Sequence, residues 1–185
     1  MKKIIIASLF CVLSCMEDKK GPIPQIRPPS VNNVSANKTN ESEAAKKWLI
    51  KNIESYFQAD PGNMDKVMQN ITTRDYYNYK TDAMNVDMDV DGSLTLKEFQ
   101  DKWRMKFDVQ KAGIGVGFLI TGQDWDEIKV SKCDLILETL DDTYLFDVIL
   151  IDKKYDVKYP ITISVIKNQS SFLIEDILQE VPQSN

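Results

Sequence analysis

The chain has 185 residues, of which 43% are hydrophobic, 28% charged and 9% aromatic, so one soluble domain is expected and a fibrous or wholly disordered protein is excluded. Its formal net charge of -5, without any dense run of Lys or Arg, argues against nucleic acid as a partner. Because the chain contains no histidine, a Ser-His or Cys-His catalytic pair and zinc bound through imidazole are excluded within it.

Residues 1–14 predict a signal peptide. Two lysines precede the apolar run Ile4–Leu13, which is too short to span a bilayer. The run ends in Val12-Leu13-Ser14-Cys15, which resembles the lipobox of bacterial lipoproteins, where a small residue precedes the cysteine that becomes lipidated. This resemblance implies lipidation of Cys15 and anchoring in the cell envelope, at the outer membrane or the cell surface. An ordinary secretory leader cleaved nearby is the alternative.

Residues 15–42 predict the lipidated cysteine followed by a flexible tether. The segment is rich in Pro, Ser and Asn and has few large apolar residues, so it lacks the surface to offset its ordering entropy. The thiol of Cys133 then has no cysteine partner in the mature chain, and we expect it to be a small core residue.

Residues 43–185 predict a single α+β domain that begins with helices. Helical periodicity places Ala44, Trp48, Ile50, Ile53 and Phe57 largely on one face of a helix over 43–58, with Ser42 as its N-cap. Further helices are predicted over 64–70, from Thr72 or Thr73 to about residue 85, and from about residue 95 to residue 107.

The segment 87–98, between the last two predicted helices, carries oxygen-bearing side chains at alternate positions. It reads Asp87-Met88-Asp89-Val90-Asp91-Gly92-Ser93-Leu94-Thr95-Leu96-Lys97-Glu98 and resembles the EF-hand calcium-binding loop at every position that carries chemistry. Gly92 stands where that loop bends sharply. The resemblance implies Ca²⁺ as the bound ion, held by Asp87, Asp89, Asp91, the carbonyl of Ser93, Thr95 (directly or through water) and Glu98.

EF-hand loops normally occur in pairs, but no second loop is found in this sequence. Residues 60–63 lack the carboxylate spacing and the terminal glutamate, and Asp141-Asp142 is predicted to be a strand turn. A solitary loop favours a structural ion site over a calcium sensor. An acidic turn that binds no metal is the alternative. The acidic residues around Trp125 are expected to form a solvated turn.

The second half of the domain predicts strands. Glycines punctuate an apolar stretch over 114–120, and alternating apolar residues predict strands over 128–140, 144–152, 161–165 and 172–178. Short turns between consecutive strands indicate a curved antiparallel sheet after the helices. The three tyrosines over 76–79, with Trp103 and Trp125, are expected to pack in the core, although they could line a pocket.

The order of helices and strands over residues 43–178 resembles the cone fold of the nuclear-transport-factor-two-like superfamily. The closing segment Ser171-Phe172-Leu173-Ile174-Glu175-Asp176-Ile177 is similar to the last strand of many members. The resemblance implies helices that pack into the concave face of the sheet. A cystatin-like arrangement would give the same pattern.

These patterns predict a non-enzymatic, calcium-binding lipoprotein that recognises a protein, a glycan or a small ligand at the cell surface. One alternative is an enzyme or a small-ligand carrier, because cone folds often enclose a pocket. A second alternative is a calcium-responsive sensor. Neither catalytic residues nor an organic cofactor can be assigned from the sequence.

Overall fold

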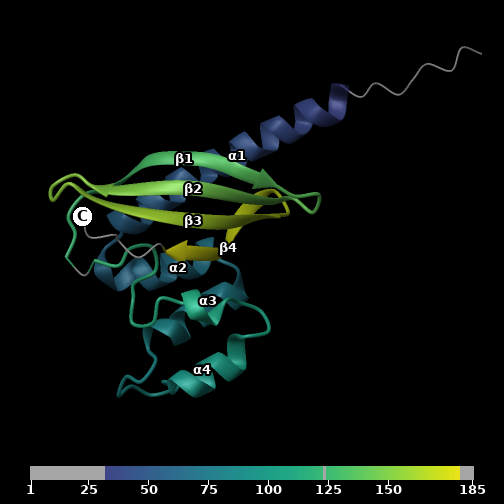
Figure 1. Ribbon diagram of the computed structural model, residues 1–185. Helices are drawn as coiled ribbons and strands as arrows, with labels where there is room; N and C mark the ends of the chain where they lie inside the picture. The colour runs from purple at the N-terminus through teal and green to yellow at the C-terminus, as the bar shows by residue number, and fades with distance from the viewer. Residues whose placement is uncertain (1–31, 123, 180–185) are drawn as a thin grey trace, which may run out of the picture. The chain divides into compact units, whose positions relative to one another are not determined.

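Helices come first in the chain and an antiparallel sheet follows, as the sequence predicts for an α+β fold (Figure 1). The computed structural model describes residues 32–122 and 124–179, which all belong to one compact unit. The predicted signal peptide, Cys15 and the start of the tether lie outside the described residues. The helices are α1 (Asn32–Gln58), α2 (Met64–Ile71), α3 (Arg74–Met84) and α4 (Leu96–Trp103), with short 3-10 turns η1 (Pro61–Asn63) and η2 (Val109–Lys111).

The first helix begins earlier than predicted. α1 starts at Asn32, so residues 32–42 are helical where a tether was expected, and Ser42 is a buried residue inside the helix instead of its N-cap. No Pro or Gly interrupts the sequence from Asn32 to Gln58, so a helix fixed by packing at one end extends at little further cost. The buried face consists of Ala45, Leu49, Ile53 and Phe57, whereas Ala44 is exposed.

Side-chain caps explain where α3 and α4 begin. The Thr73 hydroxyl accepts a hydrogen bond from the Tyr76 N–H at 3.2 Å, as expected for an N-cap. Thr95 caps α4 in the same way and forms a capping box with Glu98. α4 ends at Trp103 and not at the predicted residue 107.

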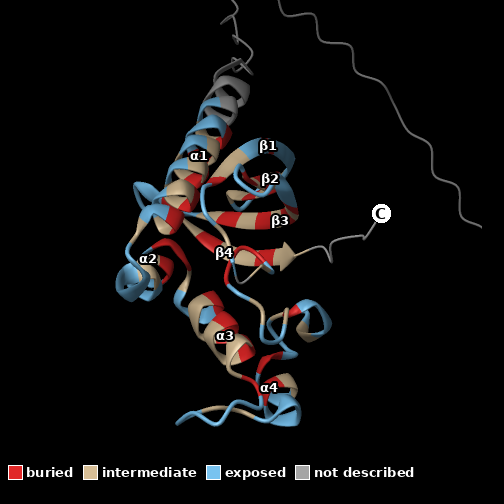
Figure 2. Cartoon of the chain, turned by 90° about the vertical axis from the view of Figure 1, so that its left-hand side faces the viewer, coloured by how far each residue is buried: buried red, intermediate tan, exposed pale blue. Residues whose placement is uncertain are grey.

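The sheet is an open four-stranded meander in the order β1 (Ile128–Glu138), β2 (Thr143–Asp152), β3 (Val157–Asn168) and β4 (Ser171–Gln179). All three pairings are antiparallel, and the strands bend along their length (Figure 1). Strict alternation on β2 buries every second residue, and Figure 2 shows the same alternation along β3. The predicted meander is therefore confirmed.

The core lies between the inner face of the sheet and the helices. Phe146, Val148, Leu150 and Ile163 from the sheet are fully buried, as is Leu49 from α1. Figure 2 shows that buried residues of α1 and α3 gather on one side of each helix. Cys133 is also buried, as predicted, and burial raises the pKa of its thiol to about 11, which keeps the thiol protonated at neutral pH.

The apolar stretch 114–120 is not a strand, contrary to the prediction. Gly113 and Gly115 have φ values of +62° and +69°, which lie outside the extended region. The Gly115 N–H donates to the Ala83 carbonyl at 3.0 Å, and the Gln179 side chain of β4 donates to the Gly117 carbonyl at 2.9 Å, so the segment is fixed to α3 and to a β4 side chain without being a strand of the sheet. Its residues Phe118, Leu119 and Ile120 nevertheless fill part of the core.

Candidate functional site

The segment 87–98 connects α3 to α4 and has the backbone bend that its glycine predicts. Gly92 has a φ of +82°, and no atom lies within 4 Å of the position that a Cβ would occupy. The glycine is therefore required by backbone conformation and not by crowding. Glu98 lies in the first turn of α4, where its Oε2 accepts hydrogen bonds from the N–H of Thr95 at 2.9 Å and from the Thr95 hydroxyl at 2.7 Å. These bonds hold the pKa of Glu98 below its ordinary value.

The two helices that flank this segment are joined by contacts outside it. The ring of Tyr79 in α3 stacks on that of Phe99 in α4, with centroids 5.5 Å apart, and meets Trp103 edge-on at 5.7 Å. Asp82 Oδ2 accepts a hydrogen bond from Trp103 Nε1 at 2.7 Å and pairs with Lys102 Nζ at the same distance. The ends of the 87–98 segment are therefore held in place by aromatic packing and by a partly buried carboxylate.

Five of the six predicted calcium ligands are exposed, Ser93 is partly buried, and all six are spread along the segment. Among the described residues, no Lys or Arg lies within 4.0 Å of Asp87, Asp89 or Asp91, and no three Asp, Glu, Cys or His side chains are grouped closely enough to hold a metal ion. Asp87 itself has a φ of +57°, and its N–H donates to the Leu94 carbonyl at 2.9 Å. The segment thus has an open conformation.

The donor set nevertheless fits calcium in its chemistry. Calcium takes carboxylate, carbonyl and hydroxyl oxygens in a flexible shell, and the segment presents these groups with no protein cation among the described residues to neutralise Asp87, Asp89 and Asp91. Glu98 is already on the first turn of α4, although its carboxylate is turned to Thr95. Calcium binding would therefore require the segment to close and Glu98 to give up or share its bonds to Thr95.

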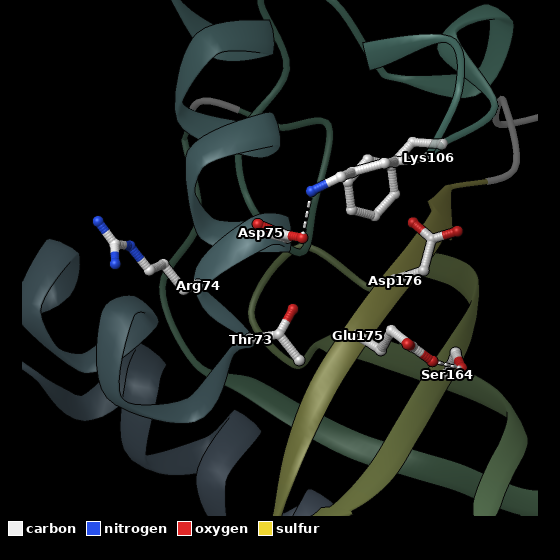
Figure 3. A pocket seen from close by; sticks show the side chains of 8 residues that line it. Thr73, Arg74, Asp75, Lys106, Ser164, Glu175 and Asp176 are labelled. Carbon is white, nitrogen blue, oxygen red and sulfur yellow. Dashed lines mark hydrogen bonds and ion pairs between the residues drawn. The ribbon is translucent and has the colours of Figure 1, made fainter. Parts of the chain in front are cut away.

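A second candidate site is a cavity of about 660 Å³ between α3, the residues after α4, and the strands β3 and β4. Figure 3 shows Lys106 directed at Asp75 and Glu175 directed at Ser164, whereas Arg74 points away from the other charged side chains. The Lys106 Nζ lies 2.6 Å from Asp75 Oδ2. The cavity is lined by Thr73, Arg74, Asp75, Lys106, Phe107, Ser164, Glu175 and Asp176.

Behind this cavity lies a buried lysine that the sequence did not single out. Lys80 is only 2% exposed, and its Nζ lies 3.1 Å from the Ala112 carbonyl oxygen, 3.4 Å from that of Gly113 and 3.5 Å from Gln179 Oε1. Burial lowers the pKa of Lys80 to about 8, against the opposing effect of Asp176. Its position on the buried face of α3, between Tyr76 and Ala83, was the available sequence signal.

Other acidic and aromatic residues have structural surroundings. In the turn around Trp125, Asp126 pairs with Lys154 at 2.7 Å and Glu127 with Lys153 at 3.4 Å. Tyr76, Tyr79 and Trp103 are buried in the core, as predicted, while Tyr77 and Trp125 pack against it only in part.

Comparison of the chain with protein-family models, with curated proteins and with solved structures found no match. The resemblances to the EF-hand loop and to the cone fold therefore rest on the sequence and on the order of elements. Within the part of the chain that the structure describes, no helix has the length and apolar character needed to cross a membrane.

Proposed function

We propose that this protein is an exported, calcium-binding lipoprotein whose segment 87–98 is a structural ion site on a binding module. The ion would be held by carboxylates of Asp87, Asp89, Asp91 and Glu98, together with oxygens of Ser93 and Thr95. The observation that carries this proposal is the helix–loop–helix geometry, with Gly92 at φ +82° and Glu98 capping the first turn of the exiting helix.

The packing around the segment supports a structural ion site over a sensor. Tyr79 is 3% exposed and contacts Phe99 and Trp103, so α3 and α4 are joined by a buried aromatic cluster that lies outside the proposed ion ligands. A calcium sensor needs helices that separate on binding. Closure of the exposed segment around an ion costs ordering entropy, which weakens binding. We expect a Ca²⁺ dissociation constant of the order of 10⁻⁴ to 10⁻³ M, which is typical of extracellular modules.

The packed inner face of the sheet favours a binding module over an enzyme with an enclosed pocket. Phe146, Leu150 and Ile163 are 0% exposed on that face. Phe118, from the segment after η2, is 2% exposed in the same core and contacts the rings of Tyr56 and Tyr76. The 660 Å³ cavity lies instead beside β4, at the junction with α3. A small-ligand carrier is therefore the alternative function, and this cavity is the observation that favours it.

Calcium titration of the full mature chain by isothermal calorimetry tests the ion site. We expect one ion per chain and a loss of binding in Asp89→Asn, because one of four carboxylates is removed. Asp101→Asn, on the exposed side of α4, is the matched control and should bind calcium as the wild type does. Equal affinity in Asp89→Asn and the wild type would contradict the proposed site.

The lipid anchor needs a separate test. Cys15 is proposed to carry the lipid that attaches the chain to the outer membrane or the cell surface. Expression of the full precursor in a bacterium, followed by membrane fractionation and mass spectrometry of the N-terminal peptide, should find a lipidated Cys15. Cys15→Ser should move the protein to the soluble fraction. An unmodified cysteine in membrane-free protein would overturn the anchor without affecting the calcium site.

A further inference from the structure

A β-bulge in the pairing of β3 with β4 lies at the cavity beside β4. On β3, Ser164 pairs with Asp176 and Val165 pairs with Ile174, so Glu175 is the extra residue of a β-bulge. Consecutive residues of a regular strand point to opposite faces. The bulge allows both Glu175 and Asp176 to line the same cavity, and bulges of this kind are enriched beside functional sites.

These two carboxylates have no cationic partner within ion-pair distance in the part of the chain that the structure describes. The other charges at the cavity are accounted for, since Lys106 is paired with Asp75 at 2.6 Å and Arg74 points away in Figure 3. Within the described residues, no Lys or Arg nitrogen lies within 4.0 Å of Glu175 or Asp176. Glu175 accepts a hydrogen bond from the Ser164 hydroxyl at 3.5 Å, and Asp176 accepts the Ile177 N–H at 2.9 Å.

The surroundings of Asp176 disfavour its charge. Burial is the first cause of its raised pKa, and the nearby carboxylates of Glu175 and Asp108 raise it further. The positive charge of Lys80 acts in the opposite direction and lowers the pKa of Asp176. A cation that entered the cavity would offset the repulsion between Glu175 and Asp176, and no described side chain within ion-pair distance does so.

An aromatic ring distinguishes the cavity from an oxygen-only metal site. Phe107 lines it and is held by stacking on Tyr79, with ring centroids 4.2 Å apart and an interplanar angle of 16°. Carboxylates beside an aromatic ring suit an organic ammonium group, which gains from the ring as well as from the charges. The volume of about 660 Å³ is also that of a small-molecule site.

We propose that this cavity binds a small organic cation with a primary ammonium group, with Glu175 and Asp176 as its counter-ions and Phe107 beside its alkyl part. The site belongs to α3, the residues after α4 and the β3–β4 edge, and it is separate from the calcium segment 87–98. It gives the binding module a ligand class that neither the sequence motifs nor the calcium site specifies.

Titration of the full mature chain with n-butylammonium, in saturating calcium, tests this site by calorimetry and by NMR shift mapping. We expect saturable binding with shifts at β4 and at Phe107, and an affinity about tenfold lower in Asp176→Asn, since a charge-assisted contact is lost. Glu175→Gln should weaken binding in the same way and serves as the second variant if Asp176→Asn unfolds. Glu43→Gln, an exposed carboxylate on α1, is the matched control and should leave the affinity unchanged.

Butyrate, which has the same alkyl chain and the opposite charge, should not bind. Saturable binding of n-butylammonium that falls in both cavity variants and not in the control supports the proposal. Equal binding by the wild type and both variants, equal binding of butyrate, or no saturable binding would overturn it. Because calcium is saturating throughout, failure of the calcium site and failure of this cavity give different results.

Discussion

The segment 87–98 and the cavity beside β4 share one chain and one pair of helices, yet they are assembled in opposite ways. The proposed ligands of the segment all lie between Asp87 and Glu98 and depend on local backbone conformation, and all except the partly buried Ser93 are exposed. The cavity takes its walls from α3, from Lys106 and Phe107 after α4, and from strands that lie far along the sequence. The first site is visible as a motif, and the second exists only after folding.

This difference predicts which substitutions disrupt each site. Substitutions of the exposed carboxylates in the 87–98 segment should change ion affinity and leave the core intact, because the flanking helices are joined by Tyr79, Phe99 and Trp103 outside the segment. The cavity depends on the same aromatic cluster through Phe107. The cluster is therefore the point where both regions can be disrupted together.

The largest effect is expected from Tyr79→Ala. The ring is 3% exposed and contacts Phe99, Trp103 and Phe107, so its loss should lower the free energy of unfolding by about 3–5 kcal/mol in urea titration. Tyr155→Ala, at a 52% exposed tyrosine, is the control and should change it by less than about 0.5 kcal/mol. Similar losses in both variants would show that the cluster does not join the two regions.

Glu98→Gln should separate calcium binding from folding. Glutamine keeps the capping-box hydrogen bonds to Thr95 but removes the charge, so calcium affinity should fall about ten- to a hundredfold while the melting temperature without calcium stays near that of the wild type. Calcium calorimetry and thermal unfolding in EGTA measure the two quantities. A large fall in the melting temperature of Glu98→Gln without calcium would show that Glu98 acts mainly as part of the helix cap.

The buried Lys80 should make the free energy of unfolding depend on pH. Its folded pKa of about 8 lies below its ordinary value, so above pH 8 the folded state binds fewer protons than the unfolded state and stability rises with pH. Between about pH 8.5 and 9.5, the wild type should gain about 1 kcal/mol per pH unit relative to Lys80→Met. Urea unfolding of both proteins at each pH measures this, and parallel pH profiles would contradict the burial of an ionisable amine.

The smallest effect is expected from Gly92→Ala. Nothing lies within 4 Å of the added methyl group, so the cost of about 1 kcal/mol comes from the φ of +82° alone. Gly62→Ala is a matched control, because that position is equally open and has no positive φ. Equal stability of the two variants in urea titration would indicate that the backbone bend at Gly92 is not required.

Local patterns explain how much of the fold was predictable. Alternation at Tyr144, Phe146 and Val148 predicted β2, and Thr73 was one of two residues predicted to cap α3. The helix after the 87–98 segment was predicted to begin at about residue 95, and α4 begins at Leu96 after its N-cap Thr95. Each of these signals lies within a few residues of the element it specifies. The order of helices and strands and the antiparallel meander follow from them.

Most of the features that the sequence did not predict depend on contacts between residues that lie far apart in the chain. α1 continues upstream of Ser42 because nothing interrupts it, and residues 114–120 leave the extended region because Gly113 and Gly115 attach them to α3. The bulge at Glu175 depends on pairing with β3, and the burial of Lys80 depends on α3 meeting the 112–113 carbonyls. Sequence patterns alone therefore do not predict the cavity.

Thermal unfolding of the full mature chain, in 10 mM calcium and then in excess EGTA, tests the calcium site most directly. With a dissociation constant of about 10⁻⁴ M, saturation should stabilise the chain by about 2.7 kcal/mol and raise the melting temperature by roughly 5–10 °C. Asp89→Asn should lose most of this increase, whereas Asp101→Asn should keep it. Superimposable melting curves of the wild type in calcium and in EGTA would contradict a structural calcium site at residues 87–98.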